Sequence, residues 1–177
     1  MHFVPTKIVG ILCLAGLLIA APVAQADEDT QATLLQPSAV SEAPGFIQRT
    51  QASVQDALDQ AMDLLNIPYR RGGSAPETGF DCSGFVKHVF REGLGLILPR
   101  SSRELSNTGE TVQKDELKPG DLVFFNTMRR AFSHVGIYLG NNQFVHAPRT
   151  GASVRVEDIR ESYWKKRYNG ARRVSED

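Results

Sequence analysis

Cysteine is scarce in this sequence, and neither sign of charge is in excess. Only Cys13 and Cys82 occur among 177 residues, so the disulfide framework that staples small secreted domains is not expected. The 20 basic residues balance 20 acidic ones, and the total charge therefore gives no indication of nucleic-acid binding. The 41% hydrophobic content allows a globular core, and the length indicates one domain with extensions.

The N-terminal apolar run, residues 8–21, is too short for a membrane helix, which needs roughly 20 apolar residues. It follows Lys7, and Ala24-Gln25-Ala26 supplies the small residues that a signal peptidase reads. We therefore expect residues 1–26 to be a secretory signal cleaved after Ala26. The mature protein would then be periplasmic and not stably inserted in a membrane. The alternative is an uncleaved anchor or a buried helix.

Cys13 lies in the middle of the apolar run and follows Leu12, whereas a lipoprotein signal places a small residue before its cysteine. No lipid anchor is therefore expected. If Cys13 leaves with the signal, the mature chain keeps Cys82 as its single thiol, which cannot form an internal disulfide and is open to oxidation after export. Free cysteine is often a small buried apolar residue, so the neighbours of Cys82 must distinguish a reactive role from a structural one.

The remainder of the chain divides into a leader and one domain. Residues 27–52 mix polar residues and proline without a period, which predicts a flexible leader. The domain is expected to span residues 53–177. Its first helix is predicted to start at Ser53 and to stop before Pro68. A second helix is predicted to begin at Cys82 and to end near residues 93–95.

Short strand patterns follow the two helical ones. A turn at residues 118–121 leads into the first of them, and Gly140-Asn141-Asn142 is typical of a hairpin. Helices followed by successive short strands predict an α+β fold, with the N-terminal helices packed on a small antiparallel sheet. The expected strands are residues 122–125, 134–139, 143–147, 154–156 and 171–174.

A thiol at the start of a helix meets backbone N–H groups and the positive end of the helix dipole. Both favour the thiolate, which is the attacking form, and the same N–H groups can stabilise an oxyanion. Asp81 fits the cap position before Cys82, and Gly84 leaves room for a substrate or for another backbone. The four residues Asp81 to Gly84 form a weak signal alone and need a base from elsewhere in the chain.

Three histidines of the mature chain are candidates for that base. His88 follows Cys82 on the same helix by more than one turn, so we expect it to be a surface or packing residue. His134 opens an alternating strand on the face opposite Val135, where a base facing a cleft would lie. His146 lies on the returning strand, where it could accept a hydrogen bond from His134 and hold its tautomer.

The hairpin between these strands provides a check. A loop of Asn141-Asn142 alone would turn His146 away from His134. A three-residue loop starting at Gly140 would pair His146 with Gly136 and place both imidazoles on one face, close enough for ring-length side chains to meet. We therefore predict an odd-length loop or a bulge.

Four ordered motifs, within about residues 54–174, resemble the NlpC family of papain-like cell-wall peptidases. The resemblance implies a papain-like fold with Cys82 as nucleophile, His134 as base and His146 as orienting residue. It also implies an acyl-enzyme route that needs no metal and no cofactor. The motifs are Asp81-Cys82-Ser83-Gly84-Phe85, Gly120-Asp121-Leu122-Val123-Phe124-Phe125, His134-Val135-Gly136-Ile137-Tyr138 and Phe144-Val145-His146-Ala147.

By the same resemblance, five residues are expected at the substrate groove: Tyr69, Asp81, Ser83, Arg100 and Ser101. The implied partners are peptidoglycan peptides, cut next to meso-diaminopimelate by a monomeric enzyme. The C-terminal segment, residues 163–174, is similar to members that cut the D-Ala–diaminopimelate crosslink, whereas other members cut the γ-D-Glu–diaminopimelate bond. The sequence departs from the family at the missing lipobox and at Leu105, where many relatives carry Gln.

Other readings of the same residues remain open. Cys82, His134 and His146 are possible zinc ligands, although no closely spaced ligand pair accompanies them. A catalytically silent wall-binding module is a second alternative. A third is an amidase or acyltransferase, because a scaffold does not fix the acyl group.

Overall fold

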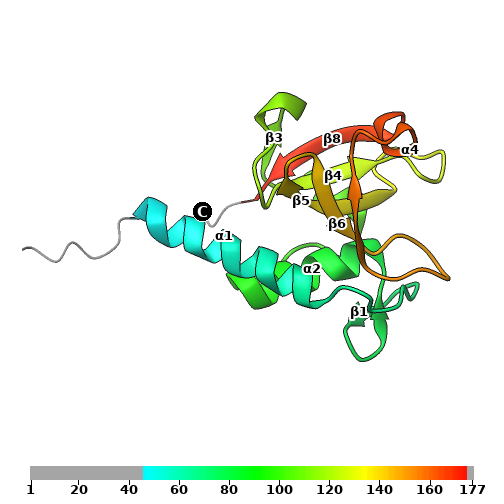
Figure 1. Cartoon of the computed structure of the whole chain (residues 1–177), viewed down its shortest axis with the longest axis horizontal. Coiled ribbons are helices and arrows are strands. Elements are labelled where there is room, and N and C mark those ends of the chain that lie inside the picture. The colour runs from blue at the N-terminus through cyan, green and yellow to red at the C-terminus, as the bar shows by residue number, and fades with distance from the viewer. Residues whose placement is uncertain (1–45, 175–177) are drawn as a thin grey trace, which may run out of the picture. The chain divides into compact units, whose positions relative to one another are not determined.

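A computed structural model of the chain describes the backbone of residues 46–174 and the side chains of residues 53–174 (Figure 1). The predicted signal, residues 1–26, lies outside the described residues, and so does most of the predicted leader, residues 27–52. Within the described part of the chain, no helix has the length and apolar character needed to cross a membrane.

Two helices pack side by side, α1 (Phe46–Asp63) and α2 (Cys82–Leu94) (Figure 1). Helix α1 starts at Phe46, well before the predicted Ser53. Helix α2 begins at Cys82 as predicted and ends at the C-cap Gly95, whose φ of 69° suits a residue without Cβ. The helices approach closely at Gly93, where a Cβ would lie 2.5 Å from Cα of Ala57.

The remaining chain forms a six-stranded sheet whose neighbouring strands are all antiparallel, in the order β3-β8-β4-β5-β6-β7. The predicted α+β class is confirmed. The last two predicted strands are longer or displaced, as residues 155–158 and 168–173. The strands are β3 (Glu110–Val112), β4 (Leu122–Phe125), β5 (His134–Gly140), β6 (Gln143–His146), β7 (Arg155–Asp158) and β8 (Tyr168–Arg173).

Several short elements were not predicted. No helix or strand was predicted within residues 71–76 or 99–111, yet each range contains a strand or a helix of two to four residues. Segments this short show no period, so contacts with the rest of the fold decide their structure. They are β1 (Ser74–Ala75), β2 (Gly79–Phe80), α3 (Ser102–Leu105), β3 of the six-stranded sheet, a 3₁₀ turn (Lys114–Glu116) and α4 (Ser162–Lys165).

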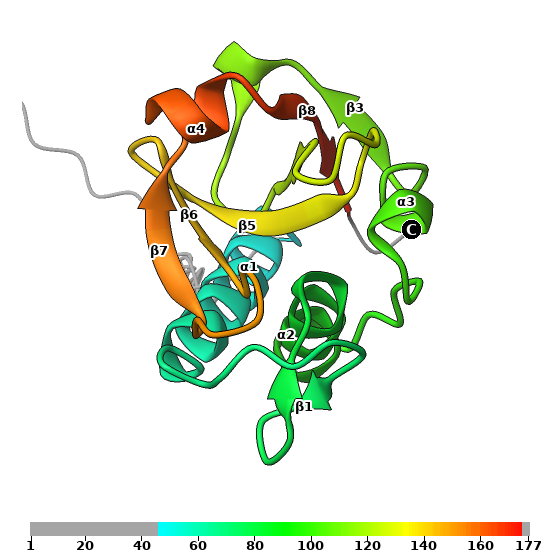
Figure 2. The same cartoon turned by 90° about the vertical axis from the view of Figure 1, so that its right-hand side faces the viewer.

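Both faces of the sheet are covered, as Figure 2 shows for α1 and α2 on one side and α4 on the other. Helices α1 and α2 pack on the face that carries Phe124 and Val135. Trp164 of α4 packs on the opposite face against Phe125 and Phe144. Double coverage explains why all four residues of β4 are buried and why its sequence is continuously apolar rather than alternating.

The β5–β6 hairpin contains the predicted irregularity. Tyr138 pairs with Phe144, but the next pair is Gly140 with Gln143, so Leu139 is an extra residue in β5. The turn itself is Asn141-Asn142, both with positive φ as a type I′ turn requires. The bulge keeps the register in which Ile137 pairs with Val145. Because neighbouring pairs continue that register, His146 comes opposite Gly136, as predicted.

Gly136→Ala should destabilise the protein by about 1–3 kcal/mol through overpacking. A Cβ at this position would lie 2.7 Å from Cδ2 of Phe144 and 3.2 Å from Cβ of His146. The free energy of unfolding in urea measures the effect. Ile97→Ala is the control, because Ile97 is 84% exposed and should change stability by no more than about 0.5 kcal/mol. Equal stability of the two variants would contradict this packing.

Candidate active site

Cys82 occupies the first position of α2, directly after its N-cap. Asp81 has extended backbone angles, and its Oδ1 accepts a hydrogen bond of 2.8 Å from the Gly84 amide. The backbone amides of Ser83 and Val135 lie near the sulfur of Cys82 and act to lower its pKa. Val135 is the second residue of β5, directly after His134, so the thiol lies where the start of α2 meets the start of β5.

Gly84 has no side chain where another segment of backbone lies against it. A Cβ there would collide with the carbonyl oxygen of Gly73 in the loop before β1. The sequence left open whether this glycine makes room for substrate or for backbone, and the structure shows the backbone contact. The loop and the start of α2 are thereby held together.

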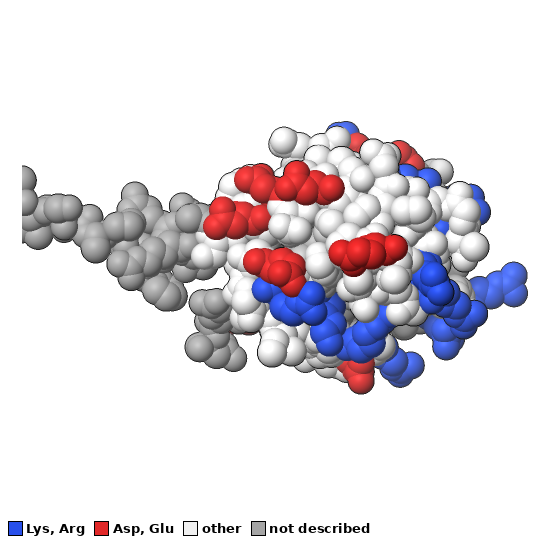
Figure 3. Space-filling view, turned by 90° about the horizontal axis from the view of Figure 1, so that it is seen from below, with Lys and Arg blue, Asp and Glu red and all other residues white. Residues whose placement is uncertain are grey.

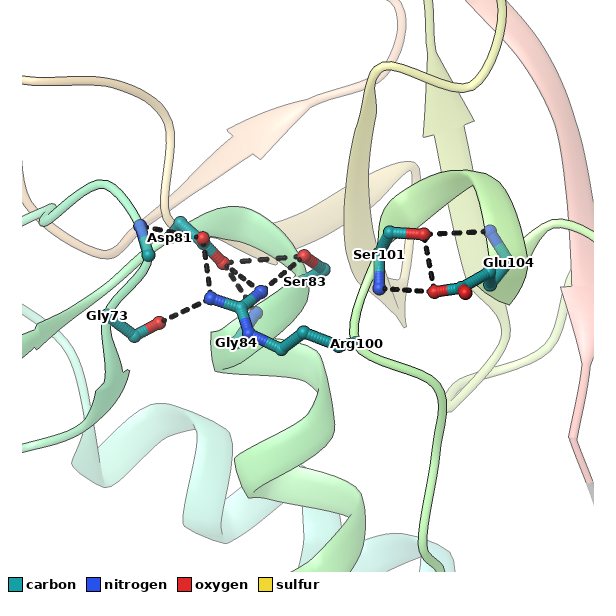
Figure 4. Close-up of polar contacts among 8 residues, drawn as sticks. Gly73, Asp81, Ser83, Gly84, Arg100, Ser101 and Glu104 are labelled. Atoms are coloured by element: carbon teal, nitrogen blue, oxygen red, sulfur yellow. Dashed lines mark hydrogen bonds and ion pairs between the residues drawn. The ribbon is translucent and has the colours of Figure 1, made fainter.

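Arg100 binds the carboxylate of Asp81, as Figure 4 shows. Its Nη2 lies 2.7 Å from Oδ2 and its Nη1 2.9 Å from Oδ1 of Asp81, and Nη1 also donates to Ser83 Oγ at 2.9 Å. Oδ2 further accepts from the Gly72 amide at 2.9 Å. The polar atoms of Asp81 and Ser83 are thus occupied within the protein.

Ser101 is used in the same internal way. It caps α3 in a reciprocal capping box, in which its hydroxyl accepts from the Glu104 amide and the Glu104 carboxylate accepts from the Ser101 amide. Neither Arg100 nor Ser101 belongs to the lining of the cavity at Cys82. The sequence resemblance implied groove positions for both, whereas the structure shows them supporting α2 and α3.

The pKa of Cys82 is raised to about 11, mainly by burial and also by the carboxylate of Asp81. The amides of Val135 and Ser83 and the guanidinium of Arg100 offset part of this increase. Although part of its surface is exposed, the thiol is therefore neutral in the free protein. The sequence predicted a thiolate from the helix start alone, but that argument omitted the desolvation by β5 and its loop.

The two imidazoles of the hairpin are in direct contact. Nε2 of His134 lies 2.7 Å from Nδ1 of His146, and the ring of His134 stacks on Trp164. Burial lowers the pKa of His134 well below its usual 6.5, and the neighbouring His146 lowers it further. Burial also lowers the pKa of His146, which Glu157 partly offsets. Both rings are therefore neutral at neutral pH.

Glu157 completes this group and was not predicted. Its Oε2 lies 2.9 Å from Nε2 of His146. Burial acts to raise the pKa of Glu157, but the hydrogen bond from His146 and the nearby Arg155 hold it below its usual value. No motif in the sequence marks this residue, because it contributes one acid to a short edge strand whose pairing only the fold reveals.

A cavity of about 710 Å³ opens at these residues. Cys82 and His134 both line it, as do Tyr69, Asp81 and Ser83. The fully buried His146 lies behind His134 and outside the lining. Further lining residues include Trp164, Tyr163, Arg71, Arg149, Arg155, Glu157 and Glu161.

Charge is unevenly distributed over the surface although it sums to zero. On the face shown in Figure 3, Lys and Arg side chains gather toward the right of the view, and most Asp and Glu side chains lie toward the left. The cavity wall likewise carries three arginines, Arg71, Arg149 and Arg155. Arg155 forms an ion pair with Glu157. Within the described part of the chain, the other two arginines of the lining, Arg71 and Arg149, form no ion pair.

The other candidate groups do not join this site. His88 is buried in α2 against Phe80, at 5.1 Å between ring centroids, and is not part of the cavity lining. That position agrees with a packing role. Among residues 53–174, whose side chains the structure describes, no three or more His, Cys, Asp or Glu residues are arranged to hold a metal ion.

Comparison with known proteins identifies relatives of this arrangement. The model of the NlpC/P60 family matches residues 66–173. Murein DD-endopeptidase MepS/Murein LD-carboxypeptidase of Escherichia coli (strain K12) is 51% identical over 117 residues, which are 66% of this chain and 61% of that protein. Gamma-DL-glutamyl hydrolase of Bacillus subtilis (strain 168) is 43% identical over 117 residues, which are 66% of this chain and 28% of that protein.

A solved structure shares the fold. The crystal structure of an NlpC/P60 family protein from Bacillus cereus ATCC 10987 has a TM-score of 0.63 and 34% identity, over 68% of this chain and 39% of that one. The chain therefore spans less than two thirds of each of these three proteins.

Arg100→Gln should make the Cys82 thiol harder to ionise. The carboxylate of Asp81 raises the pKa of Cys82 and Arg100 lowers it, so losing the guanidinium leaves the carboxylate unopposed. The rate of Cys82 alkylation, measured against pH, should rise at higher pH than in the wild type. Arg91→Gln on α2, the helix that starts at Cys82, removes an exposed ion pair with Glu92 and is the control. Coincident profiles for Arg100→Gln and the wild type would refute this role.

The buried imidazoles should make the fold sensitive to acid. His134 and His146 have lowered pKa values in the folded protein, so the unfolded chain binds their protons more readily. Stability is then lost as pH falls below the unfolded value near 6.5 toward the folded-state values, by up to about 1 kcal/mol per pH unit for each group. Urea unfolding between about pH 7.5 and pH 5 measures this slope. His134→Gln should flatten it, and an unchanged slope would contradict the assignment.

Proposed function

The chain belongs to the NlpC/P60 family, and we propose that it is a cysteine peptidase that hydrolyses peptide bonds of peptidoglycan. The observation that carries the proposal is the cavity lined by both Cys82 and His134, with His146 in hydrogen-bond contact behind His134. A 51% identical relative is a murein endopeptidase. The proposed enzyme is exported by the signal at residues 1–26 and acts as a periplasmic monomer.

In the proposed reaction, Cys82 is the nucleophile and His134 the general base. Both are neutral before reaction, so His134 takes the thiol proton while the sulfur attacks the peptide carbonyl carbon. The Nε2 atom of His134 faces His146, which leaves Nδ1 to exchange the proton. Collapse of the tetrahedral intermediate breaks the C–N bond, and His134 returns the proton to the departing amine.

The resulting thioester is hydrolysed by the same groups. His134 removes a proton from water, the hydroxide oxygen attacks the thioester carbon, and the leaving sulfur regains a proton as the product carboxylate departs. Backbone N–H groups at the start of α2 support the negative oxygen in both steps. Tyr69 lines the cavity with a pKa raised by burial and by Cys82, so its phenol keeps a proton to donate.

The substrate residues are proposed to divide into two groups. Tyr69, Asp81 and Ser83 line the cavity and would form the wall that contacts the peptide. Arg100 and Ser101 would act behind that wall by holding Asp81 and α3 in place. Because its side-chain oxygens are occupied by Arg100 and by backbone amides, Asp81 would shape the wall rather than bind a cation of the substrate.

The bond that we propose is cut is the D-Ala–diaminopimelate crosslink, because the 51% identical relative is a murein DD-endopeptidase. The γ-D-Glu–diaminopimelate bond is the second choice, and the 43% identical gamma-DL-glutamyl hydrolase favours it. Both reactions use the same nucleophile and base. The contacts of the peptide on either side of the scissile bond would distinguish them.

Digestion of purified sacculi tests this function. The wild type should release new muropeptides, and mass spectrometry of the products identifies the bond cut. Cys82→Ala and His134→Ala should each reduce release by at least about 10³-fold, because they remove the nucleophile and the base. Cys82→Ala should keep the fold of α2, so binding of this variant to sacculi can be measured without turnover. Activity should persist in EDTA.

Two outcomes would exclude the proposal. Unchanged release by Cys82→Ala would exclude the thiol mechanism. Stoichiometric binding of the wild type to sacculi without any product would favour a silent wall-binding module.

A further inference from the structure

The side chains of three adjacent strands form one line of hydrogen bonds. His134 of β5 contacts His146 of β6 at 2.7 Å, and His146 contacts Glu157 of β7 at 2.9 Å. The strands are neighbours in the sheet and appear in sequence in Figure 2. Phe144 pairs with Glu157 and His146 with Arg155, so Glu157 reaches His146 along a diagonal of the β6–β7 ladder.

A pair of neutral imidazoles does not fix its own proton positions. Nε2 of His134 could donate to Nδ1 of His146, or Nδ1 of His146 could donate to Nε2 of His134. Only the first arrangement leaves Nδ1 of His134 without a proton and able to accept one. The second places a proton on that atom and removes the base. The 2.7 Å distance between the two nitrogens is compatible with both arrangements. A further hydrogen-bonding group must therefore determine which tautomer each ring adopts.

Glu157 determines the tautomers because an ionised carboxylate only accepts hydrogen bonds. Its contact with His146 therefore requires the proton of His146 on Nε2, which leaves Nδ1 as an acceptor. His134 must then donate from Nε2 and keep Nδ1 free. Arg155 stabilises the ionised carboxylate of Glu157, because its Nη2 lies 2.6 Å from Oε1. The other oxygen, Oε2, contacts the imidazole of His146.

We propose that Glu157 is a positioning residue that sets the tautomers of His146 and His134 and so keeps His134 competent as a base. Its importance for turnover rests on the proposed peptidase function, but the tautomers themselves do not. Burial adds a second effect. When His134 takes up the thiol proton, the positive charge forms in a buried site, and the carboxylate one imidazole away stabilises it.

Glu157→Gln is the decisive variant, because an amide of the same shape can donate to Nε2 of His146 and favour the opposite tautomer. We expect kcat on sacculus fragments to fall by about 10- to 100-fold, the range known for residues that orient metal-binding histidines, with little change in KM. Glu157→Asp keeps an acceptor and should recover part of the rate. Asp158→Asn is the matched control, since it is the same change at an acid of β7 that pairs with Arg160.

Nitrogen-15 NMR of the histidine side chains reads the tautomers without any substrate. In the wild type at neutral pH, both His134 and His146 should carry their proton on Nε2. In Glu157→Gln the proton of at least one ring should move to Nδ1, whereas Asp158→Asn should match the wild type. A change in folding stability alone would not move these signals.

The outcomes separate this proposal from the proposed function. If the wild type digests no sacculi but both His134 and His146 carry their proton on Nε2, the proposed peptidase function is excluded and the proposed role of Glu157 is not. Protons on Nδ1 in the wild type, or a Glu157→Gln variant with wild-type signals and wild-type kcat, would overturn the role of Glu157. If the Gln variant does not fold, protons on Nδ1 in the wild-type spectrum would still overturn the role of Glu157.

Discussion

The contact between His134 and His146 depends on one extra residue in the strand that carries the first of them. Leu139 has no partner of its own across the β5–β6 hairpin, and this bulge restores the register that places both imidazoles on one face. Because side chains alternate along a strand, a shift of one residue would move His146 to the opposite face. Gly136 then makes room for the histidine that comes opposite it.

The thiol depends on a different set of contacts. Asp81 caps α2, Arg100 binds the carboxylate of Asp81, and Gly84 touches the backbone of Gly73. These contacts fix the start of the helix against the loop before β1. They also determine the electrostatics, because the carboxylate beside Cys82 opposes ionisation of the thiol and the guanidinium offsets it. A buried neutral thiol and a buried neutral imidazole result, rather than an ion pair formed in advance.

Double coverage of the sheet links the two halves of the site. Helices α1 and α2 cover one face and bring Cys82 to the start of β5. Trp164 covers the other face and stacks on His134. The imidazoles are therefore shielded from water, and of the two rings it is His134 that lines the cavity at Cys82. Shielding lowers their pKa values, so the proposed base keeps its lone pair well below neutral pH.

Local sequence was sufficient wherever the decisive interactions are local. It predicted α2 from Cys82 to its glycine end and the hairpin irregularity near Gly140, because caps and turn residues act within a few positions. It also pointed to Cys82, His134 and His146 as one group. It placed the start of α1 incorrectly. It also missed β1, β2, β3, α3 and α4, because such short segments depend on packing rather than on a period.

Only the tertiary structure decided what surrounds those residues. Arg100 reaches Asp81, and Glu157 reaches His146 across the edge of the sheet. The neutral state of Cys82 follows from its burial, which depends on how α2 meets β5. The sequence alone determined the fold class and the residues with reactive side chains, because these follow from hydrophobic pattern and residue type. Proton positions and pKa values required the structure, because desolvation and charge act through space between segments far apart in the chain.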